Sequence, residues 1–327
     1  MKRLFYFAAA LPLLLTSCNK EDVTSDYDNT PVPLSVNATI GISSESISRS
    51  LVTGAAFGEE SDIGIFITGT GYTPKVTIYT FDGSAWNLKP DPVQSPIYLN
   101  SKATVYGFYP VTEPSSGSPI TANTTDKTIP VTVASSYNAI ATDVPDNQAD
   151  YLYATDGTNA TTMAEVSKSD PNASLKFYHA LSQLSFVINK GENFSGTGTL
   201  TSLTVAAETS NITGTGTLKL NGTGIELSGS LSKSITLTGS TTINAYNVTP
   251  STNVIATALV APLATKQEVT LTMKIDGQDY TGTISNAEWA AGSNYIYTVT
   301  VGSGTLTITS VSIQGWVNVG SGSVTVE

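Results

Sequence analysis

Hydrophobic and polar residues alternate along most of the chain, a pattern typical of β-strands that bury one face. Val269, Leu271, Met273 and Ile275 alternate with polar neighbours, and the alternation resumes at Tyr280 after an Asp-Gly pair. Because Asp-Gly is a preferred two-residue turn between antiparallel strands, this stretch predicts a β-hairpin.

Further strands are predicted along the whole sequence. Alternating or β-branched segments occur at 75–81 (KVTIYTF), 103–110 (ATVYGFYP), 127–133 (KTIPVTV) and 295–301, and the alternating residues Leu306 and Ile308 follow a glycine-rich turn. No amphipathic helical pattern is long enough to organise a domain, and no repeat of fixed period stands out. Short strands separated by Gly, Pro and Asn predict an all-β fold of the sandwich type.

The segment 175–191 (LKFYHALSQLSFVINKG) changes the parity of its apolar residues. Leu175 and Phe177 share one face of a strand with His179, whereas Leu184 and Phe186 lie on the opposite parity. A strand whose buried face changes parity must accommodate one extra residue. We therefore expect a β-bulge or a tight bend near residues 182–183.

His179 lies beside this bend and is the only histidine in the chain. One interpretation is a catalytic or metal-binding histidine. The other is a partly buried ring that holds local backbone groups by hydrogen bonds. The chain offers no second histidine and no nearby thiol, and this inventory favours the structural role.

The N-terminus predicts an exported lipoprotein. Lys2 and Arg3 precede an apolar run at 4–15 that is too short for a comfortable membrane span, which is typical of a signal peptide, predicted at 1–17. Cys18 is the only cysteine, and the preceding Leu-Thr-Ser resembles the bacterial lipobox, in which the thiol is acylated with fatty acid. An ordinary signal peptide with an incidental cysteine is the alternative. The following Asn-Lys-Glu-Asp resembles an export signal to the outer face of the outer membrane.

Composition and charge exclude several kinds of partner. The chain of 327 residues has 15 basic and 26 acidic side chains and no basic cluster, so it should repel nucleic acid. No apolar segment after the leader approaches the ~20 residues that span a bilayer. The sequence contains no phosphate-binding loop, no catalytic-triad motif and no paired-carboxylate motif. We therefore expect that the protein binds no cofactor or metal and is not an enzyme.

The length after the leader is sufficient for two domains. We expect a flexible polar tether at 18–33, an N-terminal β-sandwich domain at 34–168 and a C-terminal β-sandwich domain at 169–327. The boundary falls near SKSDPNAS (167–174), a polar segment that contains a proline.

Several segments resemble one known family. FYHALSQLSF (177–186) resembles the opening of the C-terminal domain in the fimbrillin family, the subunits of type V pili on Gram-negative anaerobes. Five other segments also resemble that family and occur along the chain in the family's order. They are GEESDIGIF (58–66), ATVYGFYP (103–110), ADYLYAT (149–155), EWAAGSNYIYTVTV (288–301) and SVSIQGWV (310–317). The resemblance implies two tandem transthyretin-like, Greek-key type β-sandwich domains and a structural role in an adhesive fimbria.

The resemblance also implies a route of assembly. Family subunits are exported as lipoproteins, and an arginine-specific, trypsin-like protease cuts near the N-terminus and releases the lipid with the first strand. A strand from a neighbouring subunit then fills the open groove by donor-strand exchange. Here the expendable strand is PLSVNATIGI (33–42). The implied partners are other fimbrial subunits, the protease, the outer membrane, and a host or bacterial surface ligand.

Arg49 fits this route because it is the only arginine after the leader. It lies in the polar segment that follows the first strand, and the implied cut separates Arg49 from Ser50. The alternative is that Arg49 is a solvent-exposed arginine with no functional role. At the other end of the chain, VNVGSGSVTVE (317–327) is either a donor strand or the last strand of the second domain.

Two other classes of function are open. A non-polymerising adhesin or glycan-binding lipoprotein would stack sugars on Trp86 in FDGSAWNLKPD (81–91), although a hairpin tip with one exposed aromatic is the simpler interpretation. A calcium site or an enzyme would use Asp143, Asp146 and Asp150, which lack the spacing of a calcium loop and fit turn chemistry better. The sequence favours the pilus subunit, located first at the outer membrane and then in the fimbrium.

Overall fold

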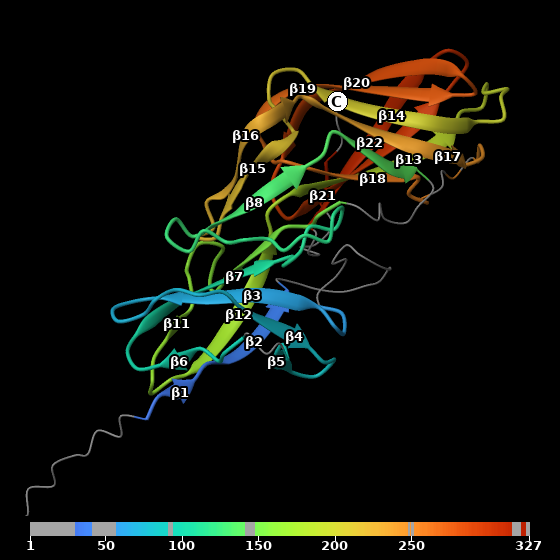
Figure 1. The fold of residues 1–327 in the computed structure, drawn as a ribbon. Helices are drawn as coiled ribbons and strands as arrows, with labels where there is room; N and C mark the ends of the chain where they lie inside the picture. Colours follow the sequence, from blue (N-terminus) through green and yellow to red (C-terminus); the bar gives the residue numbers. More distant parts are fainter. Residues whose placement is uncertain are drawn as a thin grey trace, which may run out of the picture.

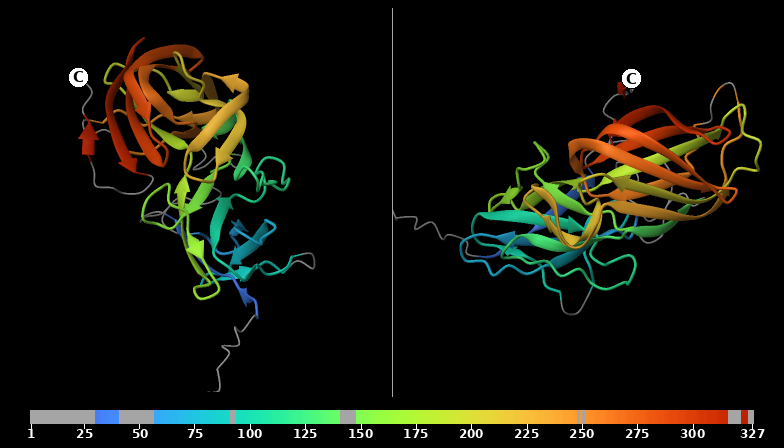
Figure 2. Two further views of the ribbon diagram at one scale, coloured as in Figure 1. Left: turned by 90° about the vertical axis from the view of Figure 1, so that its left-hand side faces the viewer. Right: turned by 90° about the horizontal axis from the view of Figure 1, so that it is seen from above.

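The computed structural model describes residues 30–40, 57–90, 94–140, 148–247, 249, 252–315 and 322–324, and this part of the chain is all-β. Its strands form two bodies stacked end to end, the lower one mainly N-terminal and the upper one mainly C-terminal (Figures 1 and 2). The prediction of an all-β fold with two tandem β-sandwich bodies is confirmed. Within the described residues, no helix is both long and apolar enough to cross a bilayer.

The lower body is an eight-stranded sheet that curls around its own core (Figure 1). Its strand order is β2 (Ser35–Ile40), β12 (Asn172–His179), β10 (Leu152–Thr155), β7 (Ala103–Tyr109), β3 (Asp62–Thr68), β4 (Thr77–Phe81) and β5 (Trp86–Leu88), with β11 (Glu165–Val166) paired to β7. A two-stranded ribbon of β1 (Val32–Pro33) and β6 (Tyr98–Leu99) closes one end. β1 differs from the prediction, which assigned residues 32 and 33 to the flexible tether.

The upper body is a ten-stranded sheet around a second core. Its order is β20 (Gln278–Trp289), β19 (Leu263–Ile275), β14 (Thr199–Ala207), β17 (Ser234–Thr242), β9 (Ser136–Ile140), β18 (Ala256–Val260), β13 (Ser182–Lys190), β21 (Ser293–Val301), β22 (Leu306–Gly315) and β23 (Gly322–Val324). A three-stranded sheet of β16 (Gly224–Ser232), β15 (Thr213–Lys219) and β8 (Thr128–Val133) leans toward the lower body (Figure 1).

Strand pairing crosses the division expected after residue 168. β9 precedes that point in sequence but pairs with β17 and β18 of the upper body, and β12 follows it but pairs with β2 and β10 of the lower body. The chain therefore passes from one body to the other several times. The two-domain division at this residue stays a prediction.

Two local predictions are confirmed by the backbone. Asp276 and Gly277 join β19 to β20 with positive φ angles of 51° and 80°, as a hairpin turn of the Asp-Gly type requires. The parity change occurs at Ala180 and Leu181, between the end of β12 and the start of β13. It is a transfer of the chain from the lower sheet to the upper one, slightly earlier than predicted.

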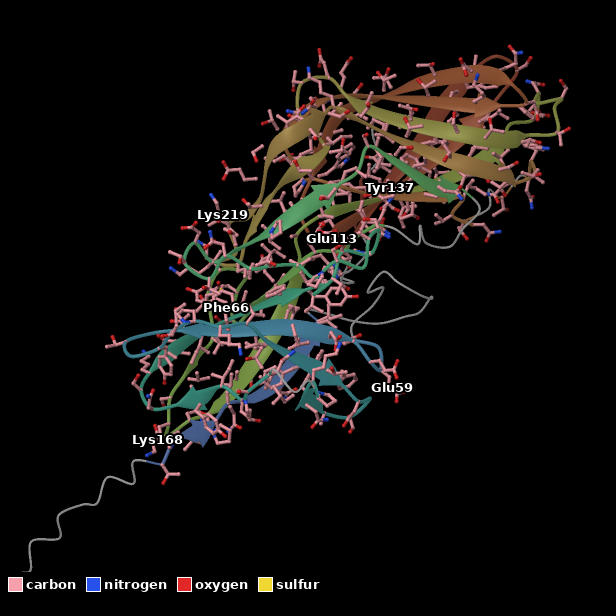
Figure 3. All side chains as sticks on the ribbon, in the orientation of Figure 1. Glu59, Phe66, Glu113, Tyr137, Lys168 and Lys219 are labelled. Carbon is pink, nitrogen blue, oxygen red and sulfur yellow. The ribbon has the colours of Figure 1, made fainter. Side chains whose placement is uncertain are left out.

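A third core cluster joins the two bodies. It packs Phe66 and Phe108 from the lower sheet against side chains of β8 and β15, and Ala180 and Leu181 at the transfer point belong to it. Figure 3 shows Phe66 on the side of β3 that faces the upper body. Tyr151 accepts a hydrogen bond from the backbone N–H of Thr132 at 2.8 Å, which ties β8 to the lower sheet.

Candidate functional site: the first strand and the seam beside it

The residues predicted to be modified or cut lie outside the described part of the chain. This applies to Cys18, Arg49 and Ser50, and of the segment 317–327 only residues 322–324 are described. Those three residues form β23, which pairs antiparallel with Val311, Ser312 and Ile313 of β22. The first strand itself is described as β2, so the groove that it fills can be examined directly.

β2 is an edge strand with one buried face. Among the described strands it pairs only with β12, in a parallel register that sets Val36 against Ala173 and Ile40 against Phe177. Residues alternate between exposed and buried along its whole length. Its inward side chains, and that of the preceding residue, belong to the core of the lower body: Leu34, Val36, Ala38 and Ile40.

This face contributes strongly to the stability of the lower body. Each of Leu34, Val36 and Ile40 is at most 7% exposed. Burial of such a side chain stabilises a fold by about 1.5–3 kcal/mol, so the three together contribute roughly 5–9 kcal/mol. Whole domains are stable by about 5–15 kcal/mol. Burial of these side chains therefore accounts for a large share of the stability expected for a domain of this size.

Trp86 closes the seam between the two edges of the curled sheet. β5 is the last strand of that sheet and β2 is the first, yet the indole nitrogen of Trp86 donates a buried hydrogen bond of 2.9 Å to the backbone carbonyl of Ala38. The Trp86 side chain is only 8% exposed. Both sequence-based interpretations of Trp86, a sugar-stacking platform and an exposed hairpin tip, are therefore wrong.

An aromatic cluster holds the Trp86 indole in place. The ring of Phe57 packs edge-on against it at 5.0 Å and also meets Phe177 at 5.3 Å, while Phe81 lies 5.2 Å from the indole. Tyr109 lies 5.9 Å from Phe57, and its burial, with smaller effects of Asp150 and Asp62, raises its pKa to about 12. The Tyr109 hydroxyl therefore stays uncharged at physiological pH.

The turn before Trp86 is built by an exposed carboxylate. Asp82 accepts hydrogen bonds from the backbone N–H groups of Ser84 and Ala85 at 2.8 and 2.7 Å, and from the Asn87 side chain at 2.7 Å. The bond from Ala85 is the main cause that lowers the pKa of Asp82 from 3.8 to about 2, and bonds from Ser84 add to it. The ionised carboxylate thus fixes the hairpin that presents the indole.

His179 forms a buried pair with Asp150, 29 residues earlier. Its Nδ1 atom donates to both carboxylate oxygens, at 3.0 and 2.9 Å, and the two side chains are 1% and 0% exposed. The predicted structural role fits this geometry, but the partner is a buried side chain rather than local backbone. Asp150 likewise belongs to a core pair and not to a turn.

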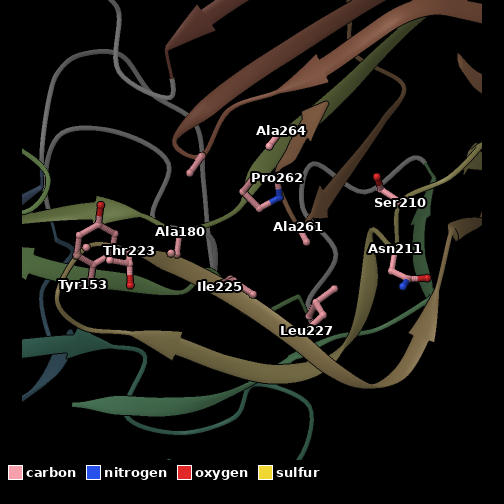
Figure 4. Close-up of a pocket in the computed structure, with 13 residues that line it drawn as sticks. Tyr153, Ala180, Ser210, Asn211, Thr223, Ile225, Leu227, Ala261, Pro262 and Ala264 are labelled. Carbon is pink, nitrogen blue, oxygen red and sulfur yellow. The ribbon is translucent and has the colours of Figure 1, made fainter. Parts of the chain in front are cut away.

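The other candidate ligand features lie elsewhere. Asp143 and Asp146 are outside the described residues, and the described ones contain no group of three or more His, Cys, Asp or Glu side chains placed to hold a metal ion. A pocket of about 630 Å³ opens between the β15–β16 hairpin and the upper body (Figure 4). Its aromatic residue, Tyr153, is 6% exposed and stacks on Tyr178 at 6.1 Å, so it offers no open face to a sugar ring.

Comparison with known proteins agrees with this architecture. A proposed cell adhesion protein from Bacteroides uniformis has a similar crystal structure, with a TM-score of 0.57, 18% identity, and coverage of 87% of this chain and 98% of the other. A second, from Bacteroides ovatus, gives a TM-score of 0.61, 16% identity, and coverage of 88% and 99%. At these identities the likeness concerns the fold. The comparison with curated proteins gave no match.

A family comparison reaches further than the structural one. The family model described as fimbrillin-like matches residues 49–316, which is most of the sequence and includes both bodies. The matched range begins at Arg49, after β2, and ends just before the segment 317–327. The chain therefore belongs to the fimbrillin-like family.

Proposed function

We propose that this protein is a structural subunit of a surface fimbria, exported as a lipoprotein and polymerised by protease-triggered strand exchange. The observation that carries the proposal is β2, an edge strand that supplies buried core side chains yet pairs with β12 alone among the described strands. Membership of the fimbrillin-like family supports a role in a pilus or in adhesion.

The proposed reaction begins with one cut. Hydrolysis of the peptide bond between Arg49 and Ser50 separates β2, with the lipid on Cys18, from the body of the subunit. Phe57, 6% exposed and packed on Trp86, lies after the cut and keeps the new N-terminus attached to the groove. Loss of β2 then exposes apolar core and leaves a row of backbone groups on β12 without partners.

A strand from a neighbouring subunit fills this groove. Main-chain hydrogen bonds to β12 supply affinity, and alternate side chains replace the buried face of β2. The proposed donor is the segment 317–327, whose described residues, 322–324, make a three-residue pairing at the edge of the upper sheet. A head-to-tail contact of this kind does not close on itself and so builds filaments.

The export route rests on the N-terminal segment. Acylation of Cys18 holds the precursor at the outer membrane, where an arginine-specific protease releases it into the growing fimbrium. In the proposal the role of the protein is polymerisation and display, and contact with a host or bacterial surface follows from that display.

A non-polymerising surface adhesin or glycan-binding lipoprotein is the second candidate. The structural neighbours from Bacteroides are named as proposed cell adhesion proteins, which suits either candidate. The buried position of Trp86 removes the feature that favoured sugar stacking. Strand exchange is favoured because it gives β2 and the position of Arg49 a common purpose.

The experiment uses the unlipidated Cys18→Ala precursor and an arginine-specific protease. Cleavage after Arg49 should yield ladders resistant to mild detergent and rods in electron micrographs. Arg49→Lys, which keeps the positive charge but resists this protease, should remain an intact, folded monomer. Ladders from uncut Arg49→Lys protein would refute the exchange mechanism. A trimmed monomer that stays soluble and stable alone would favour the adhesin.

A further inference from the structure

The backbone of β2 faces two different partners. The N–H of Ser35 donates to the carbonyl of Pro171 at 3.0 Å, so Ser35 and the alternate residues after it direct their backbone groups toward β12. Ala38 has the opposite parity, and its carbonyl points to the open edge, where it accepts the hydrogen bond from Trp86. The hydrogen bond from Trp86 therefore requires a backbone carbonyl at the position of Ala38, pointing to the open edge.

The same residue must also be small. Ala38 has its side chain on the buried face of β2 with Val36 and Ile40, is 7% exposed, and belongs with Trp86 to the core of the lower body. Phe57 and Phe81 pack on the indole at 5.0 and 5.2 Å, so the ring cannot retreat without losing these contacts. A larger side chain at this level would displace the indole and break the seam.

These two requirements also fix the direction of the strand. In a strand that runs parallel to β12, as β2 does, the residues with inward side chains direct their carbonyls to the open edge. In an antiparallel strand in the same place, the inward residues would direct their carbonyls toward β12 instead. Only a parallel strand combines, in one residue, a small inward side chain and a carbonyl for Trp86.

We infer that Trp86 selects the strand that replaces β2, by accepting only a small side chain at the level of Ala38 in a strand parallel to β12. The inference rests on the proposed function, because only an exchanging strand has to be selected. Residues 320–323 of the proposed donor are all Gly or Ser, and of these only Ser321 in the place of Ala38 also brings Val319 and Val317 into the places of Val36 and Leu34. This is the register that we infer.

This register leaves one position poorly filled. Ser323 takes the place of Ile40, a core residue that is 3% exposed in β2. A serine at this position loses most of the apolar contact that the isoleucine makes. The native strand is thus a better fit than the proposed donor at this one position, and Ser323→Ile in the donor should bind more tightly.

The test is competition on the nicked protein. The Cys18→Ala precursor is cut by the arginine-specific protease, and peptides covering residues 316–327 are added in excess. Release of the fragment that carries β2 is measured by native mass spectrometry. The wild-type and Ser321→Ala peptides should release it, Ser323→Ile should release it at lower concentration, and Ser321→Leu should be weaker by roughly tenfold or more, since overpacking is costly. Asn318→Leu, a change on the outward face, should match the wild type.

A protein variant links these effects to the indole. Trp86→Phe removes the N–H and leaves more room, so the penalty of the Ser321→Leu peptide should largely disappear in it. Equal binding of the Ser321→Leu and wild-type peptides to the unchanged protein would overturn the inference while exchange itself stands. If no peptide from 316–327 binds, the assignment of this segment as the donor fails. Selection by Trp86 is then tested with the peptide PLSVNATIGI and its Ala38→Leu form. A roughly tenfold weaker binding of the Ala38→Leu peptide supports the selection. Equal binding of these two peptides would overturn the selection as well.

Discussion

Replacement of His179 by leucine should destabilise the protein severely without touching the assembly chemistry. The substitution removes the N–H that reaches the Asp150 carboxylate at 2.9 Å and leaves that carboxylate in a site where its side chain is 0% exposed. Breaking a buried pair by removing one partner costs about 3–5 kcal/mol. The size of this loss does not follow from the sequence, which does not show the buried partner.

The expected effect is large enough to measure in several ways. For a chain of this size, 1 kcal/mol shifts the melting midpoint by about 2–4 °C, so His179→Leu should lower it by roughly 6–20 °C. His179→Asn places an amide N–H close to the position of Nδ1 and should recover part of the loss. The double variant His179→Leu/Asp150→Leu should lose much less than the sum of the single variants, because no buried charge remains.

Calorimetry and urea unfolding of the unlipidated precursor provide the measurement. Below its own melting midpoint, the His179→Leu protein should still be cut after Arg49 and still form ladders. Single variants that each lose under about 1 kcal/mol, or a double variant that loses the full sum, would refute the argument from burial. A well-folded variant that fails to assemble would instead give His179 a direct functional role.

Three further outcomes are expected. Ile40→Ala should cost about 2–5 kcal/mol in urea unfolding, whereas Asn37→Ala on the exposed face of the same strand should stay within ~0.5 kcal/mol. The pKa of Asp82 is lowered, so the stability it lends the hairpin is present above its ordinary pKa and is lost as pH falls from about 4 to about 2; a change in tryptophan fluorescence in this window should be absent in Asp82→Ala. Cys18→Ala should take up no labelled fatty acid in cells and should not fractionate with the outer membrane, and persistence in that membrane would contradict the lipid anchor.

The features predicted correctly from the sequence depend on near neighbours. Alternation at 269–275 and the Asp-Gly pair define the β19–β20 hairpin, since a two-residue turn leaves the strands no other way to pair. The parity change in 175–191 required an interruption, and the chain indeed leaves one sheet for the other at Ala180. Both follow from the period of two in a strand.

The features that were predicted wrongly from the sequence depend on contacts between distant segments. Trp86 looks exposed because its hairpin is short and polar, and only the curl of the whole sheet brings β5 to Ala38, 48 residues earlier. The Asp150–His179 pair is likewise a tertiary contact. Asp150 follows turn-forming residues in the sequence, so the sequence pattern gives no sign that its side chain is buried. Alternation identifies a strand without naming its partner, so the sequence does not show that β9 pairs with strands of the upper body or that β12 pairs with strands of the lower one.

The energetics of β2 connect stability to assembly. A strand worth roughly 5–9 kcal/mol is enough to keep the precursor folded, and its loss would bring a domain of ordinary stability close to unfolding. In the described structure β2 pairs with β12 alone and meets the opposite edge through the hydrogen bond from Trp86, and β1, which lies on the same released segment, adds only its two-residue pairing with β6. Under the proposed function, a subunit cut after Arg49 would lose this stabilising strand. A strand of matching shape from a neighbour would restore the stability, and would do so only within a polymer.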